Sequence, residues 1–159
     1  MDFCRYDEKS DGVPILAGIT AATLSSDQGV AEDVIGTEGV RVRLGTQLVD
    51  VYYIGVKGLA KDHVFYADAL AAHKAMVVGK KVNVLDDVVV KNSAGQRLAY
   101  VYLADPSGLL PGNMLNARVI GDGLGKLGNF EGNNRHRMYL ENLGFIAGQG
   151  KKGLWAKEK

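Results

Sequence analysis

Residues 40–44 alternate between apolar and basic side chains, with apolar positions at every second residue. This period is typical of a half-buried strand. The apolar-rich run 48–56 is predicted to form a second, longer strand, and Gly45-Thr-Gln47 to join the two in a β-hairpin. An earlier strand is predicted over Ile15–Leu24, ending at a polar break over Ser25–Gly29.

After residue 60 the pattern changes to a helical one. Apolar positions spaced by four, three and four residues occur at Phe65, Ala69, Ala72 and Met76. This spacing places them on one face of a helix. Asp62 is predicted to cap that helix, and Gly79 to end it.

More strands and two helices are predicted in the second half of the chain. The strands are expected at 82–85, 87–90 and 98–103, with a turn at 92–95. Asn113 is expected to cap a helix ending near 121–125, and Asn134 a helix reaching about Gly148 with Tyr139, Leu143 and Ile146 on one face. This order of elements predicts an α+β (mainly β) domain, with a small Greek-key barrel as the favoured architecture.

The composition limits the partners that the chain can attract. Its 159 residues favour a single domain, expected over residues 15–159 after an N-terminal tail or docking arm at 1–14. With 19 basic and 18 acidic side chains, the net charge of +1 gives no global attraction for nucleic acid or an anionic membrane. The single Cys4 cannot form an internal disulfide, which is compatible with a reducing compartment.

The apolar run 13–24 does not have the pattern of a signal peptide or a membrane span. It contains Pro14, is too short to cross a bilayer, and follows an acidic stretch where a signal peptide carries positive charge. No membrane span is therefore expected, and a cytoplasmic location is favoured.

Familiar catalytic motifs are absent from the sequence. There is no P-loop, dinucleotide-binding fingerprint, Ser-His-Asp arrangement or zinc motif, and Gly121–Lys126 lacks the P-loop spacing. His63, His73 and His136 are far apart in the sequence and are expected on helix surfaces.

Five segments nevertheless occur in an order that is similar to one known family. They are the hairpin 40–56, the helix end and strand 77–84, the turn and strand 95–102, residues 116–126 and the closing Gly153-Leu-Trp155. Together they resemble a staphylococcal-nuclease-like (thermonuclease) domain, from about residue 15 to residue 155. The resemblance implies an OB-fold barrel of five strands with three helices.

The resemblance also implies positions for the catalytic groups. Active members of the family hydrolyse phosphodiesters with a calcium ion, a carboxylate base and two arginines, which together stabilise a negatively charged phosphoryl transition state. Compared position by position, the arginine positions hold Tyr52 and Gln96, and the base position holds Ala60. The metal-ligand positions hold Glu38 and Lys57. Both arginines, the base and one metal carboxylate are thus replaced, which implies a catalytically inactive domain without a cofactor.

Arg97 lies one residue beyond the position of the second arginine. A one-residue shift along a strand turns a side chain to the opposite face of the sheet, and the expected role of Arg97 is that of a solvated turn residue. A candidate binding groove comprises Arg41, Arg43, Tyr52 and Arg97, with Tyr52 and Tyr53 pointing to opposite faces.

The favoured function is therefore a nuclease-like OB-fold module acting as a protein-interaction or assembly subunit, with weak nucleic-acid affinity. Segments 1–12, 25–35 and 105–112 are candidates for docking. One alternative is a calcium-dependent nuclease acting on DNA or RNA through a rearranged site. A second alternative is a binder of single-stranded nucleic acid, whose affinity would fall with salt.

The fold assignment makes further residues structural. Val40, Val42, Tyr100, Leu115 and Trp155 are expected in the core, with Trp155 holding the C-terminal helix to the barrel. Gly144 and Gly148 are expected to weaken the last long helix by roughly 1 kcal/mol each relative to alanine.

Overall fold

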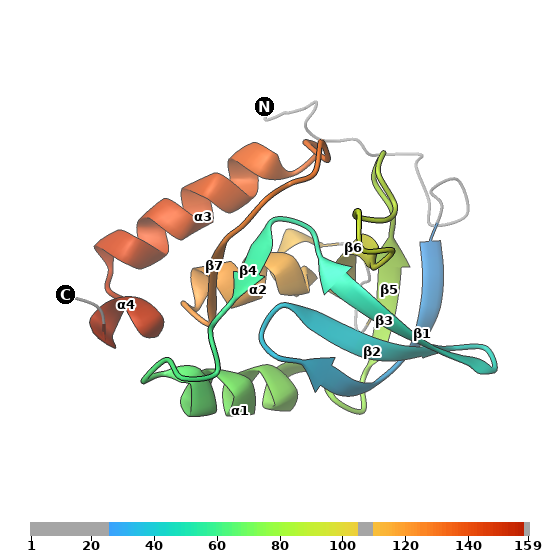
Figure 1. Cartoon of the computed structure of the whole chain (residues 1–159), viewed down its shortest axis with the longest axis horizontal. Helices are drawn as coiled ribbons and strands as arrows, with labels where there is room; N and C mark the ends of the chain where they lie inside the picture. The colour runs from blue at the N-terminus through green and yellow to red at the C-terminus, as the bar shows by residue number, and fades with distance from the viewer. Residues whose placement is uncertain (1–25, 105–109, 158–159) are drawn as a thin grey trace.

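Five strands close into a barrel in the computed structural model, which describes residues 26–104 and 110–157 (Figure 1). Their order around the barrel is β1 (Ser26–Ile35), β2 (Gly39–Leu44), β3 (Gln47–Tyr53), β6 (Arg97–Leu103) and β5 (Lys81–Leu85). Neighbouring strands are antiparallel except for β3 and β6, which are parallel. A separate two-stranded sheet pairs β4 (Val56–Gly58) with β7 (Gly125–Leu127). The barrel confirms the predicted five-stranded architecture.

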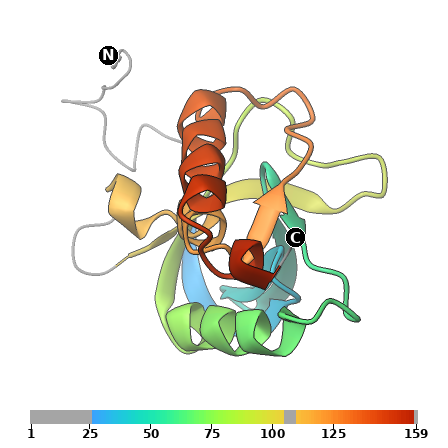
Figure 2. The same cartoon turned by 90° about the vertical axis from the view of Figure 1, so that its left-hand side faces the viewer.

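Three helices pack around the barrel, as predicted. They are α1 (Tyr66–Val77), α2 (Leu115–Gly121) and α3 (Arg137–Gln149), and two single-turn elements are η1 (Pro111–Asn113) and α4 (Leu154–Lys157). Figures 1 and 2 show α1 across one end of the barrel and α3 on the outside, beside β7. Within the described ranges, no helix is long and apolar enough to cross a membrane.

The first described strand, β1, occupies residues that the sequence pattern assigned to a break. The expected break over Ser25–Gly29 is wrong from Ser26 onward, because these residues pair with β5 and the strand continues along β2. Pairing with β5, joined by pairing with β2 from Val30 onward, satisfies the backbone in spite of a polar composition. A Cβ at Gly29 would overlap the carbonyl oxygen of Arg43, so the close approach requires glycine. The predicted strand over Ile15–Leu24 and the tail at 1–14 lie outside the described residues, and the domain division stays a prediction.

The predicted strand over 48–56 is interrupted. β3 ends at Tyr53, and Gly55 turns the chain with φ +80° before β4 begins. The ring of Phe130 lies against this turn, since a Cβ at Gly55 would be 2.5 Å from its Cε1 atom. The long strand is therefore divided into one barrel strand and one strand of the second sheet.

The helix caps and part of the α1 face differ from the predictions. α1 buries Ala69, His73, Met76 and Val77, whereas Ala72 is exposed. Asp62, Asn113 and Asn134 are not the caps. The capping positions are Phe65, Met114 and His136, and none of the three makes a side-chain cap hydrogen bond.

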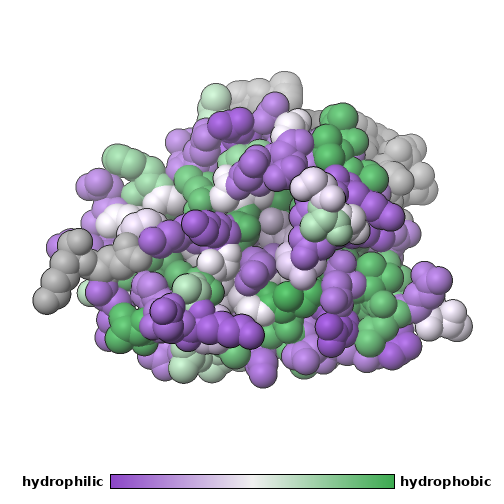
Figure 3. Space-filling view, viewed as in Figure 1, coloured by the Kyte–Doolittle hydropathy of each residue, from purple (hydrophilic) through white to green (hydrophobic). Residues whose placement is uncertain are grey.

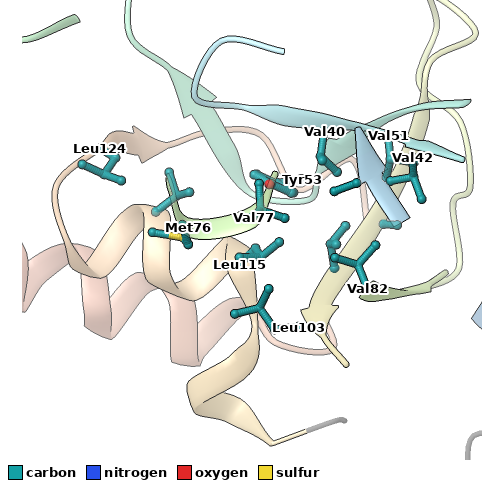
Figure 4. Close-up of a cluster of buried hydrophobic side chains, with 14 of the residues drawn as sticks. Val40, Val42, Val51, Tyr53, Met76, Val77, Val82, Leu103, Leu115 and Leu124 are labelled. Carbon is teal, nitrogen blue, oxygen red and sulfur yellow. The ribbon is translucent and has the colours of Figure 1, made fainter. Parts of the chain in front are cut away.

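Two hydrophobic clusters lie on the two faces of the barrel wall. Strand β6 shows the division, because Ala99, Val101 and Leu103 point into the barrel while Leu98, Tyr100 and Tyr102 face outward. Figure 4 shows the inner cluster, where side chains of β2, β3 and β5 meet those of α1 and α2. The outer cluster is covered by α2 and α3.

The expected core residues lie largely where the sequence placed them. Val40, Val42, Tyr100 and Leu115 are fully or almost fully buried, as predicted. Trp155 is only partly buried against the inner cluster, and the adjacent Leu154 is the fully buried residue of α4.

The predicted strand over 87–90 is a loop. Asn133 holds it in place: the Val89 N–H donates to its Oδ1 atom (2.7 Å), and its Nδ2 donates to the Val89 carbonyl (2.8 Å). Because an asparagine side chain satisfies this backbone, no neighbouring strand is needed.

Asn116 joins α2 to the barrel from a fully buried position. Its Nδ2 donates to the carbonyls of Ile54 (3.0 Å) and Ala99 (3.1 Å), and its Oδ1 accepts from the Val101 N–H (3.0 Å). Burying an amide is favourable only when it is hydrogen-bonded. Asn116 therefore fixes α2 against β6 and against the end of β3.

Candidate functional site

Tyr52, at the predicted position of the first arginine, lies on the outer face of β3. It pairs across the strands with Gly39 on β2 and Leu98 on β6 and packs, half-buried, against the outer cluster. Tyr53 points inward and is almost completely buried. The two tyrosines thus point to opposite faces, as expected, and Tyr52 supplies an aromatic surface at the predicted position of a guanidinium.

The side chains at the two predicted metal-ligand positions, Glu38 and Lys57, lie in different surroundings. The Glu38 carboxylate lies against glycine backbone, since a Cβ at Gly36 or Gly58 would overlap it. Because side chains alternate along an extended strand, the Lys57 side chain projects from one face of β4, and the Gly58 position lies on the other face. Lys57 pairs across the strands with Lys126 of β7.

This Lys57–Lys126 pair places two ammonium groups on one face of the small sheet. Like charges directly opposite each other on paired strands are unfavourable. The Nζ atom of Lys126 lies 5.5 Å from the centroid of the Trp155 ring, a cation–π distance. The predicted position of the family's metal aspartate therefore holds a lysine that is paired across the strands with a second lysine.

Ala60 and Gln96, at the predicted base and second-arginine positions, have structural surroundings. Ala60 is exposed in the segment after β4. Gln96 belongs to the predicted turn, in which the Asn92 Oδ1 accepts from the N–H groups of Ala94 and Gln96 (3.0 Å each). The Asn92 Nδ2 also donates to the Gln96 Oε1 (2.7 Å), so this side chain is engaged within the turn.

Arg97 forms ion pairs at one end of the barrel and is not a solvated turn residue. Its Nη2 lies 2.8 Å from the Asp27 Oδ2 and 3.1 Å from the Asp86 Oδ1, and its side chain is 20% exposed. Burial opposes the charge, but the hydrogen bonds and charges of the two aspartates outweigh it and raise the pKa of Arg97 above its ordinary value. Arg97 is registered with Val51, so it lies on the opposite side of the sheet from Tyr52.

Arg41 and Arg43 share the outer face of β2, and both are paired with carboxylates. Arg41 lies opposite Asp50 on β3 (2.7 Å), and Arg43 makes a two-pronged contact with Glu32 on β1. Hydrogen bonds from the arginines lower the pKa of both carboxyl groups. The candidate groove is thus divided, because two of its cations are neutralised locally and the third, Arg97, faces the other way.

His73 forms a buried network that the histidine spacing did not reveal. Its Nδ1–H donates to the Gly36 carbonyl (2.8 Å), which leaves Nε2 to accept from the Tyr53 hydroxyl (2.7 Å). Burial lowers the pKa of His73 despite the opposing effect of the Gly36 hydrogen bond. The expected surface position is wrong. The signal was present, because His73 lies four residues after Ala69 and three before Met76 on the buried stripe.

A second polar cluster fastens the segment before α3 to the barrel. Asp87 accepts from the Tyr100 hydroxyl (2.8 Å) and from the Arg135 N–H (3.2 Å). The His136 ring packs edge-on against Tyr100 at 4.7 Å, and burial, followed by the charge of Arg135, lowers the pKa of His136 to about 4. His136 is therefore half-buried against Tyr100 and is not the freely exposed residue that was expected.

The closed five-stranded barrel with three helices is that of an OB-fold domain of the nuclease type, and its predicted site positions hold aromatic, amide, methyl, ammonium and carboxylate groups. A family model for staphylococcal nuclease homologues matches residues 47–157, more than half of the chain. The chain belongs to this family. No curated protein matches it. Within residues 26–104 and 110–157, no group of three or more histidine, cysteine or carboxylate side chains is arranged to hold a metal ion.

Proposed function

We propose that this chain is a catalytically inactive, nuclease-like OB-fold module that acts as a protein-interaction or assembly subunit. The observation that carries the proposal is the position of Arg97. The one arginine close to a family catalytic position is held by Asp27 and Asp86 on the other side of the sheet from Tyr52.

The chemistry of the remaining positions supports the same conclusion. Phosphodiester hydrolysis requires cations at the developing negative charge and a base that aligns the attacking water. Tyr52 and Gln96 carry no charge that could stabilise a phosphorane, and Ala60 has no group that could accept a proton. Lys57 brings a positive charge to the place where a cation would bind.

Affinity for nucleic acid is expected to be weak. Binding a phosphate backbone depends on cations that are free to exchange counterions for phosphate. Arg41 and Arg43 already contact Asp50 and Glu32, so phosphate would have to displace a carboxylate at each.

The surface supports protein binding instead. α3 carries exposed Met138, Phe145 and Ile146, which are large apolar side chains turned away from the core. On the face drawn in Figure 3, apolar side chains are interspersed with hydrophilic ones and do not form one broad patch. An exposed apolar face on one element is typical of a site for a protein partner.

Co-purification of the tagged chain from its native source tests the assembly role. We expect it to elute within a larger complex of constant composition, identified by mass spectrometry and retained at 0.3 M salt. Elution as a free monomer at all concentrations would contradict the assembly role. The catalytic half of the proposal is tested separately, by digestion, as described in the Discussion.

A further inference from the structure

The outer side of α3 carries an apolar face that no described part of the chain covers. Met138, Tyr139, Phe145 and Ile146 are 76%, 37%, 68% and 56% exposed, and they form two pairs separated by seven residues. Residues seven apart lie on the same side of a helix. Leu140 and Ala147, on the opposite side, are fully buried, and Leu140 packs in the outer cluster. The barrel thus covers the Leu140 side of α3, while the outer side presents four large apolar side chains around the exposed polar Asn142 and Gln149.

Part of this face forms one wall of a groove between α3 and α2. Tyr139, Leu143 and Ile146 line it on the α3 side, and Pro111 of η1 and Ala117 of α2 line it on the other. The groove has a volume of about 250 Å³. Figure 2 shows α3 running along the outside of the molecule with η1 beside it. The groove is therefore open to solvent and lies beside the outer side of α3.

The rim of the groove has a positive balance of charge. Arg118 and Lys152 line it together with a single carboxylate, Asp122. None of these three side chains takes part in an ion pair with another described residue. In contrast, Arg41, Arg43 and Arg97 elsewhere on the barrel are all paired. The two rim cations are thus available to a partner, and they favour acidic groups on it.

The exposed apolar area of α3 indicates which kind of partner it can bind. α3 has 13 residues and is therefore about 20 Å long. A standard interface between globular proteins buries about 800 Å² on each side. The four exposed apolar side chains of α3, of which Tyr139 and Ile146 line the groove, supply roughly half of that. This is too little for a stable pairing of two globular surfaces, including a second copy of this chain through α3 alone. This area is sufficient for binding a single helix in a groove. Such a helix carries apolar anchor residues at positions i, i+3 or i+4, and i+7.

We propose that the α2–α3 groove binds an amphipathic helical segment of a partner protein. The apolar face of that segment packs on Tyr139, Leu143 and Ile146, and acidic residues at its edge contact Arg118 and Lys152. This inference rests on the proposed interaction function and names the surface and the class of partner that serve it.

The test uses peptides as defined probes. A phage-displayed library of random 16-residue peptides is selected on the full chain, and the Ile146→Glu variant is used only in the affinity measurements that follow. The enriched peptides are synthesised with a fluorophore, and their affinities are measured by anisotropy. We expect an enriched consensus with apolar residues at i, i+3 or i+4, and i+7 and with acidic residues, and helical circular dichroism only in the complex.

Three variants test whether the peptides bind in the groove. Ile146→Glu should weaken peptide binding at least tenfold, and Arg118→Glu about five- to tenfold with a reduced dependence on salt. Val64→Glu is the matched control, because Val64 is as exposed as Met138 but lies in the segment before α1. It should leave the affinity unchanged. Thermal unfolding of each variant checks that the fold is retained, as expected for the exposed Ile146 and Val64 and the half-buried Arg118.

Several results would overturn the groove proposal. Peptides that bind Ile146→Glu as tightly as the unchanged chain would place the interaction on another surface and leave the proposed function intact. An enriched consensus that is basic or not amphipathic would refute the partner class. Self-association in analytical ultracentrifugation that Ile146→Glu abolishes would make a second copy the occupant. Competition by a synthetic peptide of residues 13–24 would make the chain's own segment the occupant. No enriched peptide at all, together with a free monomer from the native source, would refute the groove and the proposed function together.

Discussion

Replacing Arg97 with methionine separates its structural role from a role in phosphate binding. Methionine keeps much of the aliphatic volume but removes the guanidinium that joins Asp27 on β1 and Asp86 after β5. The side chain is 20% exposed and Asp86 is 22% exposed, whereas Asp27 is 53% exposed. Solvent therefore screens the Asp27 contact, which contributes little, and most of the effect comes from leaving Asp86 partly buried without its partner.

The expected loss for Arg97→Met is about 2 kcal/mol in the free energy of unfolding, in the range for a hydrogen bond to a charged group. Urea unfolding followed by Trp155 fluorescence measures it. The matched control is Arg43→Met, which removes an exposed pair on the same barrel and should leave the free energy of unfolding almost unchanged, because solvent already screens that pair.

The opposite pattern would refute this reasoning. If Arg97→Met unfolds at the same urea concentration as the unchanged chain but loses affinity for single-stranded DNA, Arg97 belongs to a phosphate-binding surface and not to the end of the barrel. Equal losses for Arg97→Met and Arg43→Met would show that the two contacts at Arg97 are no stronger than an exposed pair.

Three further outcomes follow from the packing and from the buried histidine. In a urea titration, Gly55→Ala should destabilise the fold by more than about 2 kcal/mol, because a φ of +80° is strained for alanine and the Phe130 ring occupies the Cβ position. The control Gly45→Ala, at φ +63° with nothing within 4 Å of the added Cβ, should lower the free energy of unfolding by only about 1 kcal/mol. The free energy of unfolding should fall as the pH is lowered from 6.5 towards 4, because the pKa of His136 is about 4 when folded and the unfolded chain takes up the proton first. In urea titrations at pH 7 and pH 4.5, the His136→Phe variant should show up to about 3 kcal/mol less of this loss than the unchanged chain. In thermal unfolding, Gly148→Ala should stabilise the chain by about 0.5–1 kcal/mol, because nothing lies within 4 Å of the added Cβ and alanine favours a helix more than glycine does. An unchanged or lower stability would contradict the assignment of residue 148 to a helix.

The sequence predicted the barrel where side-chain periodicity and turn residues agreed. The alternation over 40–44, followed by a glycine turn, required a hairpin, and β2 and β3 are paired there residue by residue. The Asn92–Gly95 turn was likewise determined by its own side chains, because an asparagine can hydrogen-bond the backbone two residues further on.

Predictions were wrong where distant residues determine the local structure. Nothing near Ser26–Gly29 favours a strand, and β1 forms there because β5 and β2 present their edges to it. Nothing near Val88 forbids a strand, but Asn133, more than 40 residues away, satisfies the Val89 backbone and keeps the segment a loop. Gly144 was expected only to weaken α3. A Cβ there would lie 2.8 Å from the Leu127 Cδ1 atom, so it also allows α3 to approach β7 closely.

The contacts around the candidate site could not be predicted from the sequence. The assignment of Tyr52, Lys57 and Ala60 to catalytic positions rests on the resemblance to the family and stays a prediction. The resemblance could not show that Arg97 is held by two aspartates, because Asp27 is 70 residues away in the sequence. For the same reason the buried pairing of His73 with Tyr53 was not visible, although the spacing on α1 indicated its burial.

The central claim, that this family member does not hydrolyse nucleic acid, is tested most directly by digestion. The purified chain is incubated with labelled single-stranded DNA and with RNA at millimolar calcium, with EDTA as one control and with Glu38→Gln and Arg97→Met as matched variants. We predict no cleavage above the background of a mock purification, and no difference between the chain and its variants. Calcium-dependent cleavage that co-purifies with the chain and is abolished by Glu38→Gln or Arg97→Met would contradict the account.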